Sequence, residues 1–409
     1  MPKTALNLYE EIVIDALVKC NAKLRKSFKT AFIQTLILYM VLPRRINFTQ
    51  MGLHSDSCEQ RYRQLYEKEF DWMDYNIELM KMRFTPDSRK AIAIDASFIK
   101  KSGNKTPYIG KLWSGCKGTA KRGLEILGIG VIDIDEHDCM MLSADQTPNK
   151  VALEQLAKEI KCGEITLIHW YLALLNNYKE RLLKISPYVV ADAWFAKHTF
   201  IDKATKLGFQ IITRLRDDAR LYYPADRVPK GKRGRKPIKG ARVNLDDPDI
   251  SRCEEIPVDN GKAFGLKAYS PALKRIIKVV IHISEKGSHK IYMSTDLDMD
   301  YSHIIEYYRT RFQIEFCFRE GKQFTGLTHC QARHEDKLDF AFNASLTAVN
   351  VSKVVRHKSF PGLSIGLLKA HLRDIYLVKR IFARLGKRPN LSFNAKLVKV
   401  LFGFEGIAS

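Results

Sequence analysis

Residues 91–101 read Ala-Ile-Ala-Ile-Asp-Ala-Ser-Phe-Ile-Lys-Lys and mark the point where the chain changes from a helical to a strand pattern. Before them, through about residue 88, apolar residues recur at helical spacing. From here on, runs typical of strands cover residues 91–101, 123–135 and 139–147. Three strands in succession, followed by alternation of strands and helices, predict a mixed α/β sheet with helices on its faces.

The alternation continues with a helical stretch at 151–183, broken near Gly163, and then a strand, a helix and a strand at 188–195, 197–207 and 209–216. Residues 217–298 interrupt it with strand-rich sequence, including 274–284 and 289–295. We interpret this interruption as an inserted β-subdomain. Helical patterns return at 301–324 and in the tail from residue 351.

The composition points to a polyanionic partner. The chain of 409 residues carries 68 Lys and Arg against 45 Asp and Glu, a formal charge of +23, and is 45% hydrophobic. The hydrophobic content excludes a disordered chain, and the positive charge favours nucleic acid as the partner. The eight cysteines form no C-x-x-C pair, so we expect reduced, mostly buried thiols. The most apolar run, 31–42, is too short to span a bilayer, and no targeting segment is evident, so we expect an intracellular protein without membrane contact.

Residues 47–66 resemble a helix-turn-helix. We expect a short helix ending near Gly52 and a second helix, capped by Ser55 or Asp56, that presents Arg61 and Arg63 to a DNA major groove. An ordinary helical hairpin with a polar outer face explains the same pattern.

A second basic feature is the run 230–242, with seven basic and no acidic residues. Its centre, with Arg233, Arg235 and Lys236, resembles a hook that follows the floor of an A·T-rich minor groove. A solvated basic loop is the alternative, and both readings predict affinity for phosphate.

The segment YRTRFQIEFCFREGK at residues 308–322 is the most informative for chemistry. On a continuous helix, Arg311, Glu315 and Lys322 lie within about 60° of Tyr308 around the axis. A salt-bridged surface face explains the Arg311–Glu315 spacing, but not the phenylalanines of the same segment. A buried carboxylate flanked by cations is a candidate for a functional site.

Two further acids end apolar strands: Asp95 follows Ala-Ile-Ala-Ile, and Asp192 follows Tyr-Val-Val-Ala. Taken singly, each is more often a turn or cap residue than a ligand. Together with Glu315 they form a set of hard oxygen ligands suited to Mg²⁺ or Mn²⁺.

These residues carry a resemblance to a known family. Tyr308, Arg311, Glu315 and Lys322 fit the spacing Y-(2)-R-(3)-E-(6)-K, which is similar to the signature of bacterial insertion-sequence transposases of the insertion-sequence-four type. The order of Asp95, Asp192, a β-rich insertion and the glutamate also resembles that family. The resemblance implies a ribonuclease H-like fold in which Asp95, Asp192 and Glu315 are catalytic and bind two divalent ions, Mg²⁺ or Mn²⁺. Tyr308, Arg311 and Lys322 would contact DNA phosphates.

The resemblance further implies the activity and the partners. A transposase of this kind binds the terminal inverted repeats of its element, cleaves double-stranded DNA and joins the ends to a target, with or without a hairpin intermediate. It acts as a homodimer in the synaptic complex and works in the bacterial cytoplasm at the nucleoid. In that family, an aromatic pocket in the insertion accompanies the hairpin step. Residues 217–298 of this chain contain no tryptophan. We therefore expect another aromatic residue to substitute: Tyr222, Tyr223, Phe264 or Tyr269.

Two alternatives stay open: a transposase-derived DNA-binding protein without catalysis, and a ribonuclease H-fold nuclease without strand transfer. We therefore expect an α/β protein whose ribonuclease H-like mixed sheet is flanked by helices and interrupted by a β-rich insertion. The predicted units are a helical DNA-binding domain (1–88), the two parts of the catalytic core (89–216 and 300–345), the insertion (217–299) and a basic helical C-terminal region (346–409).

Overall fold

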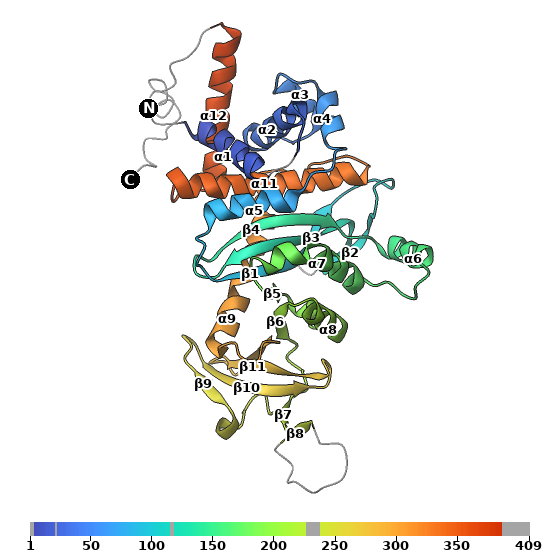
Figure 1. Cartoon of the computed structure of the whole chain (residues 1–409), viewed down its shortest axis with the longest axis vertical. Coiled ribbons are helices and arrows are strands. Elements are labelled where there is room, and N and C mark those ends of the chain that lie inside the picture. Colours follow the sequence, from blue (N-terminus) through green and yellow to red (C-terminus); the bar gives the residue numbers. More distant parts are fainter. Residues whose placement is uncertain (1–3, 21–22, 115–117, 226–237, 387–409) are drawn as a thin grey trace.

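The computed structural model describes residues 4–20, 23–114, 118–225 and 238–386 (Figure 1). Their strands form one 12-stranded mixed sheet, with helices on both faces. The strands are β1 (Lys90–Lys100), β2 (Gly110–Ser114), β3 (Thr119–Asp133), β4 (Asp138–Gln146), β5 (Tyr188–Ala191), β6 (Gln210–Leu215), β7 (Tyr222–Pro224), β8 (Lys239–Arg242), β9 (Glu254–Ile256), β10 (Lys262–Ser270), β11 (Arg275–Ile283) and β12 (His289–Ser294).

The α-helices fall into three groups along the chain. Five precede the sheet: α1 (Ala5–Lys19), α2 (Lys26–Val41), α3 (Phe48–Leu53), α4 (Glu59–Leu65) and α5 (Trp72–Arg83). Three lie between its strands: α6 (Lys150–Glu159), α7 (Leu167–Leu183) and α8 (His198–Lys206). Four follow it: α9 (Tyr301–Thr310), α10 (Gln313–Gln323), α11 (Glu335–Ser359) and α12 (Ile365–Arg384). Two short 3-10 helices are η2 (Ala193–Phe195) and η3 (Ile250–Arg252).

The centre of the sheet has the order β4-β3-β1-β5-β6. β1 and β4 are antiparallel to β3, whereas β5 is parallel to both β1 and β6. The sheet then continues without a break into the insertion, because β12 pairs antiparallel with β6 and leads to β11 and β10. The inserted strands are therefore an extension of the central sheet.

Alternation along β1 explains why this strand lies at the centre. Ile92 and Ile94 enter the apolar cluster on one face of the sheet, and Ala91 and Ala93 enter the cluster on the other face; all four are fully buried. Successive side chains of a strand point to opposite faces, so Asp95 lies on the same face as the two alanines. That face is covered by α10, which packs on β1, β3 and β4.

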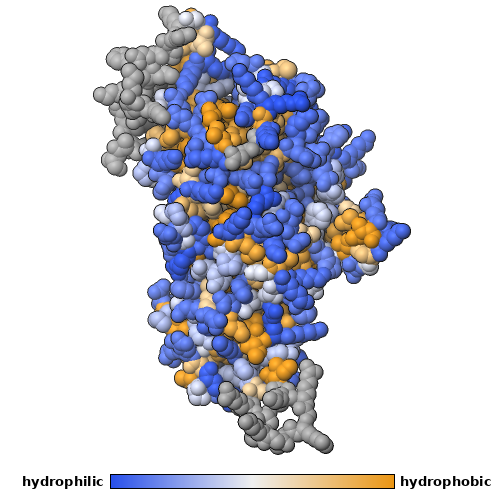
Figure 2. All heavy atoms as spheres, in the orientation of Figure 1, coloured by the Kyte–Doolittle hydropathy of each residue, from blue (hydrophilic) through white to orange (hydrophobic). Residues whose placement is uncertain are grey.

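α7 and α8 pack on the opposite face. At the edge of the sheet, α5 and α11 pack on β4, where Asn343 and Asn350 of α11 bond to its backbone, and behind them lie the N-terminal helices (Figure 1). α6 projects from the side of the molecule, and Figure 2 shows hydrophobic atoms gathered there. The exposed apolar side chains of this region include Val151 (70% exposed) and Ile160 (59% exposed). In the parts of the chain that the structure covers, no helix is long and apolar enough to cross a membrane.

Most predicted elements are present, with several differences. α11 begins at Glu335, whereas the sequence pattern placed the last helical region from residue 351. β2 was not predicted, because its five residues are too few to show a pattern. The helix predicted at 301–324 is two helices, joined at Arg311 and Phe312 by tight i→i−3 hydrogen bonds, including Arg311 N–H to Tyr308 O at 3.2 Å. The described cysteines are free of disulfides, as expected, but only Cys139 and Cys317 are fully buried, so the prediction of mostly buried thiols is wrong.

Candidate active site

Asp95 is a half-buried carboxylate of the predicted triad. Its side chain, on β1, is 18% exposed, and Oδ1 accepts a hydrogen bond from Ala96 N–H at 3.0 Å. Burial raises the pKa of Asp95 to about 6; the charge of Arg311 opposes this rise, while those of Glu315 and Asp192 add to it. The three predicted acids therefore act on one another electrostatically.

Arg311 bridges two of these acids. Its Nη1 lies 3.4 Å from Asp95 Oδ2, and its Nη2 donates to Glu315 Oε1 at 2.7 Å. The arginine is 14% exposed and sits at the joint between α9 and α10, whereas Glu315 is 40% exposed in the first turn of α10. The i, i+4 spacing predicts the pair of Arg311 with Glu315, but it does not predict the contact of Arg311 with Asp95 on β1.

Lys322 and Tyr308 are the other two residues of the predicted signature. Lys322 Nζ donates to Ser97 Oγ at 2.8 Å, which places the lysine against β1 two residues after Asp95. Burial lowers the pKa of Lys322, and the charge of Asp95 acts in the opposite direction. The ring of Tyr308 lies 5.9 Å from the guanidinium carbon of Arg311. Arg311 and Lys322 therefore contact β1, Glu315 is paired with Arg311, and the ring of Tyr308 packs on Tyr292 of β12 with centroids 5.2 Å apart.

Asp192 follows β5 and begins η2. Its side chain accepts a hydrogen bond from Trp194 N–H, and its carbonyl oxygen accepts one from Thr213 Oγ1 at 2.9 Å, on neighbouring β6. The charge of Asp192 raises the pKa of both Asp95 and Tyr308, so its carboxylate faces the same site. β1 and β5 are parallel neighbours, and Ile94 pairs with Ala191, so Asp95, in the middle of β1, lies beside Asp192, which follows the last residue of β5.

The donor chemistry of this site suits a hard divalent cation, since all three acids offer carboxylate oxygens. In the described residues, no group of three His, Cys, Asp or Glu side chains is arranged to hold a metal ion. Here the positive charge between Asp95 and Glu315 is the guanidinium of Arg311. The residue types thus fit a divalent ion, but their present arrangement does not form a closed metal site.

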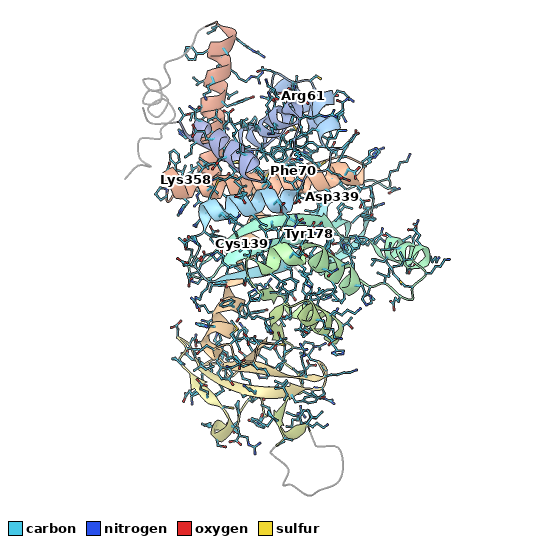
Figure 3. The ribbon with its side chains drawn as sticks, viewed as in Figure 1. Arg61, Phe70, Cys139, Tyr178, Asp339 and Lys358 are labelled. Atoms are coloured by element: carbon cyan, nitrogen blue, oxygen red, sulfur yellow. The ribbon has the colours of Figure 1, made fainter. Side chains whose placement is uncertain are left out.

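The predicted helix-turn-helix region contains α3 and α4, and Figure 3 shows Arg61 among these N-terminal helices. Arg61 Nη2 donates to Ser27 O at 3.1 Å. Arg63 pairs with Glu59 at 3.5 Å. The predicted cap is wrong: α4 begins after Cys58, because Ser55 Oγ instead accepts Ser57 N–H within the preceding turn.

Two other predictions concern the insertion. The basic residues Arg233, Arg235 and Lys236 lie outside the described residues. Of the aromatic residues that were expected to substitute for a tryptophan, Tyr223 and Phe264 are buried, at 5% and 6% exposed. Tyr222 and Tyr269 are half-buried and face each other between β7 and β10.

Sequence reasoning missed two residues of the site. Ser97 was detectable in principle, because residues two apart on a strand point to the same face, so Ser97 shares the face of Asp95. Trp194 lies two residues after Asp192, and its ring is 42% exposed.

A mixed sheet with one aspartate on a central strand and another just after the neighbouring parallel strand, covered by the helix that carries Glu315, is consistent with a nuclease fold. Residues 35–260, more than half of the chain, match the family described as DDE superfamily endonuclease, and the protein belongs to this superfamily. The match includes Asp95 and Asp192 and ends before Glu315. Endonuclease domains of this type generally use divalent metal ions. A comparison with curated proteins finds no match.

Proposed function

We propose that this endonuclease is a DNA transposase of the insertion-sequence-four type, which cleaves the ends of its own element and transfers them to target DNA. The observation that carries the proposal is the Arg311 bridge between Asp95 and Glu315. It brings the predicted glutamate helix onto the strand that bears the first aspartate, across more than two hundred residues of sequence.

The fold supports a ribonuclease H-like core in this proposal. Such a core has three antiparallel strands followed by two parallel ones, and β4-β3-β1-β5-β6 has this arrangement. The proposed core consists of residues 89–216 and 300–345, separated by the insertion at 217–299. The proposed units at 1–88 and 346–409 bind DNA ends and a second copy of the chain, so that the synaptic complex is a homodimer acting at the nucleoid.

Each site residue has a proposed role in phosphodiester chemistry. Asp95, Asp192 and Glu315 would hold two Mg²⁺ or Mn²⁺ ions, which activate the attacking hydroxyl and stabilise the leaving oxygen when bound. Lys322 and Tyr308 orient the phosphate that is cut. Arg311 neutralises the acids in the absence of DNA and is near enough to the site to turn toward a phosphate.

DNA from the two flanks of the chain's own coding sequence supplies a test substrate that includes the terminal repeats. We expect nicking in Mg²⁺, none in EDTA, and a loss of at least about a hundredfold in the charge-neutral variants of the three acids: Asp95→Asn, Asp192→Asn and Glu315→Gln. Glu320→Gln is the matched control, because it neutralises a carboxylate of the same helix that contacts Lys353 instead of the site. Nicking that survives in all three variants would overturn the assignment.

The alternatives give different products. A nuclease without strand transfer nicks this DNA but does not join pre-cleaved 3′-hydroxyl ends to a target plasmid. A DNA-binding protein without catalysis shifts the DNA on a gel and nicks nothing. A hairpin on the transposon end, seen on a denaturing gel, would support the hairpin route, and its absence alongside completed joining would exclude it.

A further inference from the structure

Trp194 presents a large apolar surface beside the proposed active site. Its ring is 42% exposed, although the residues around it are packed: Phe195 is 3% exposed and Tyr171 is 2% exposed. The backbone N–H of Trp194 donates to the side chain of Asp192, so the indole extends from the backbone turn that positions that acid. Isolated exposed apolar residues are common on protein surfaces, so exposure alone assigns no role; the ring's surroundings are more specific.

The two aromatic neighbours of the indole meet it at steep angles, so neither is stacked parallel on its flat surface. Tyr171 meets it at 68° with the ring centroids 5.9 Å apart, and Phe195 meets it at 82° and 5.1 Å. Tyr171 is itself fixed, because its hydroxyl donates to Glu125 Oε1 at 2.7 Å. In the described part of the chain, no aromatic ring stacks parallel on Trp194.

A cation accompanies this aromatic surface. Lys197 Nζ lies 3.6 Å from the centroid of the Trp194 ring, at the start of α8. A lysine held over an indole is a cation–π pair. Next to a DNA strand, the ammonium group can move to a phosphate, which leaves the indole face for a base. An aromatic surface next to a mobile cation is the combination that single-stranded nucleic acids recognise.

We propose that Trp194 stacks on an unpaired nucleobase of the DNA strand whose phosphate lies at Asp192, and that Lys197 contacts the adjoining phosphate. This inference rests on the proposed function, because it requires DNA at the site. Trp194 is here a positioning residue: it holds the strand, and takes no part in proton transfer or bond cleavage. Stacking tolerates any base, since every base has a π-face, so the site selects unpaired strands without reading their sequence.

The test compares two probes in EDTA: a short oligothymidylate strand, and a strand of equal length made only of abasic sites. Trp194→Ala should weaken binding of oligothymidylate roughly 5- to 150-fold, the effect of losing one stacked base, and change binding of the abasic strand less than about twofold. Trp194→Phe should restore most of the affinity. Lys197→Gln should weaken both probes and reduce the slope of log K against log salt by about 0.7, whereas Trp194→Ala should leave this slope unchanged.

Fluorescence gives a second readout that does not depend on affinity. Oligothymidylate should quench tryptophan emission of the parent and of Trp170→Phe, and this quenching should be lost in Trp194→Phe. Equal losses on both probes, or unchanged binding of oligothymidylate by Trp194→Ala, would overturn the inference. Because nicking in Mg²⁺ is measured separately on duplex DNA, failure of the proposed function is distinguishable from failure of this stacking role.

Discussion

Replacing Lys353 by methionine tests how the glutamate helix is fastened to the sheet. Lys353, on α11, is 7% exposed, and its Nζ donates to Asp138 Oδ1 at 2.9 Å and to Cys139 O at 2.7 Å. The same ammonium lies 3.8 Å from Glu320 Oε2, an atom with no hydrogen-bond partner of its own. One buried cation thus joins α11, β4 and the helix that carries Glu315.

The expected loss follows from the charges that the variant leaves behind. Breaking a buried ion pair by removing one partner costs about 3–5 kcal/mol. Asp138 keeps its second cation, because Arg83 Nη2 lies 2.9 Å away, whereas Glu320 loses its nearest one. We therefore expect the lower end of that range, about 3 kcal/mol of unfolding free energy for Lys353→Met. Adding Glu320→Gln should recover about 1–2 kcal/mol, because it removes the uncompensated charge.

Urea unfolding followed by circular dichroism measures these free energies. Lys358→Met is the matched control: this lysine belongs to the last turn of the same helix and is exposed, and Figure 3 shows it at that end of α11. The control should change stability by less than about 0.5 kcal/mol. If Lys353→Met lost no more than the control, or if Glu320→Gln deepened the loss, the reasoning about this buried cation would be refuted.

Three further predictions concern pH and DNA. Burial raises the pKa of Asp339, labelled in Figure 3, from 3.8 to about 7. The folded state then binds its proton more tightly than the unfolded state, so stability falls as pH rises from about 4 to 7, by up to about 4 kcal/mol. Asp339→Asn should thus be more stable than the parent in urea at pH 8 but not at pH 4; an equal gain at both would contradict this. Lys322→Gln should weaken duplex binding and lower the salt slope by about 0.9, with an unchanged slope as the contrary result. Neutralising three basic residues of the run 230–242 should also weaken DNA binding and flatten its salt dependence, and a gel-shift series in salt measures this. These residues are Arg233, Arg235 and Lys236.

Local patterns predicted the strands of the central sheet because a strand that is buried on both faces is an uninterrupted run of apolar residues. The run from Ala91 to Ile94 has no polar residue, and all four side chains are fully buried on one face or the other. Asp95 was detectable for the same reason, since a carboxylate that interrupts such a run requires an explanation. The spacing of Arg311 and Glu315 likewise predicted their ion pair correctly.

Other features depended on contacts that no local pattern contains. The break between α9 and α10 involves neither glycine nor proline, and Arg311 at the joint contacts Asp95, which is distant in sequence. The start of α4 was misplaced because a side-chain hydrogen bond of Ser55 closes a turn that propensity alone assigns to the helix. Trp194 was not singled out as part of the site, since a single tryptophan near a strand end is typical of a core residue until its exposure is known.

The pairing of β6 with β12 has a mechanical consequence. Four residue pairs, from Ile291 with Leu215 to Ser294 with Ile212, connect the insertion to the strand beside β5. Thr213, in the middle of this seam, donates to the backbone carbonyl of Asp192. A displacement of the insertion by DNA, which the proposed function places on it, would therefore be transmitted through paired strands to the turn that positions this acid. Strain in that DNA and the alignment of the site would then be coupled, and breaking the pairs between β6 and β12 would uncouple them.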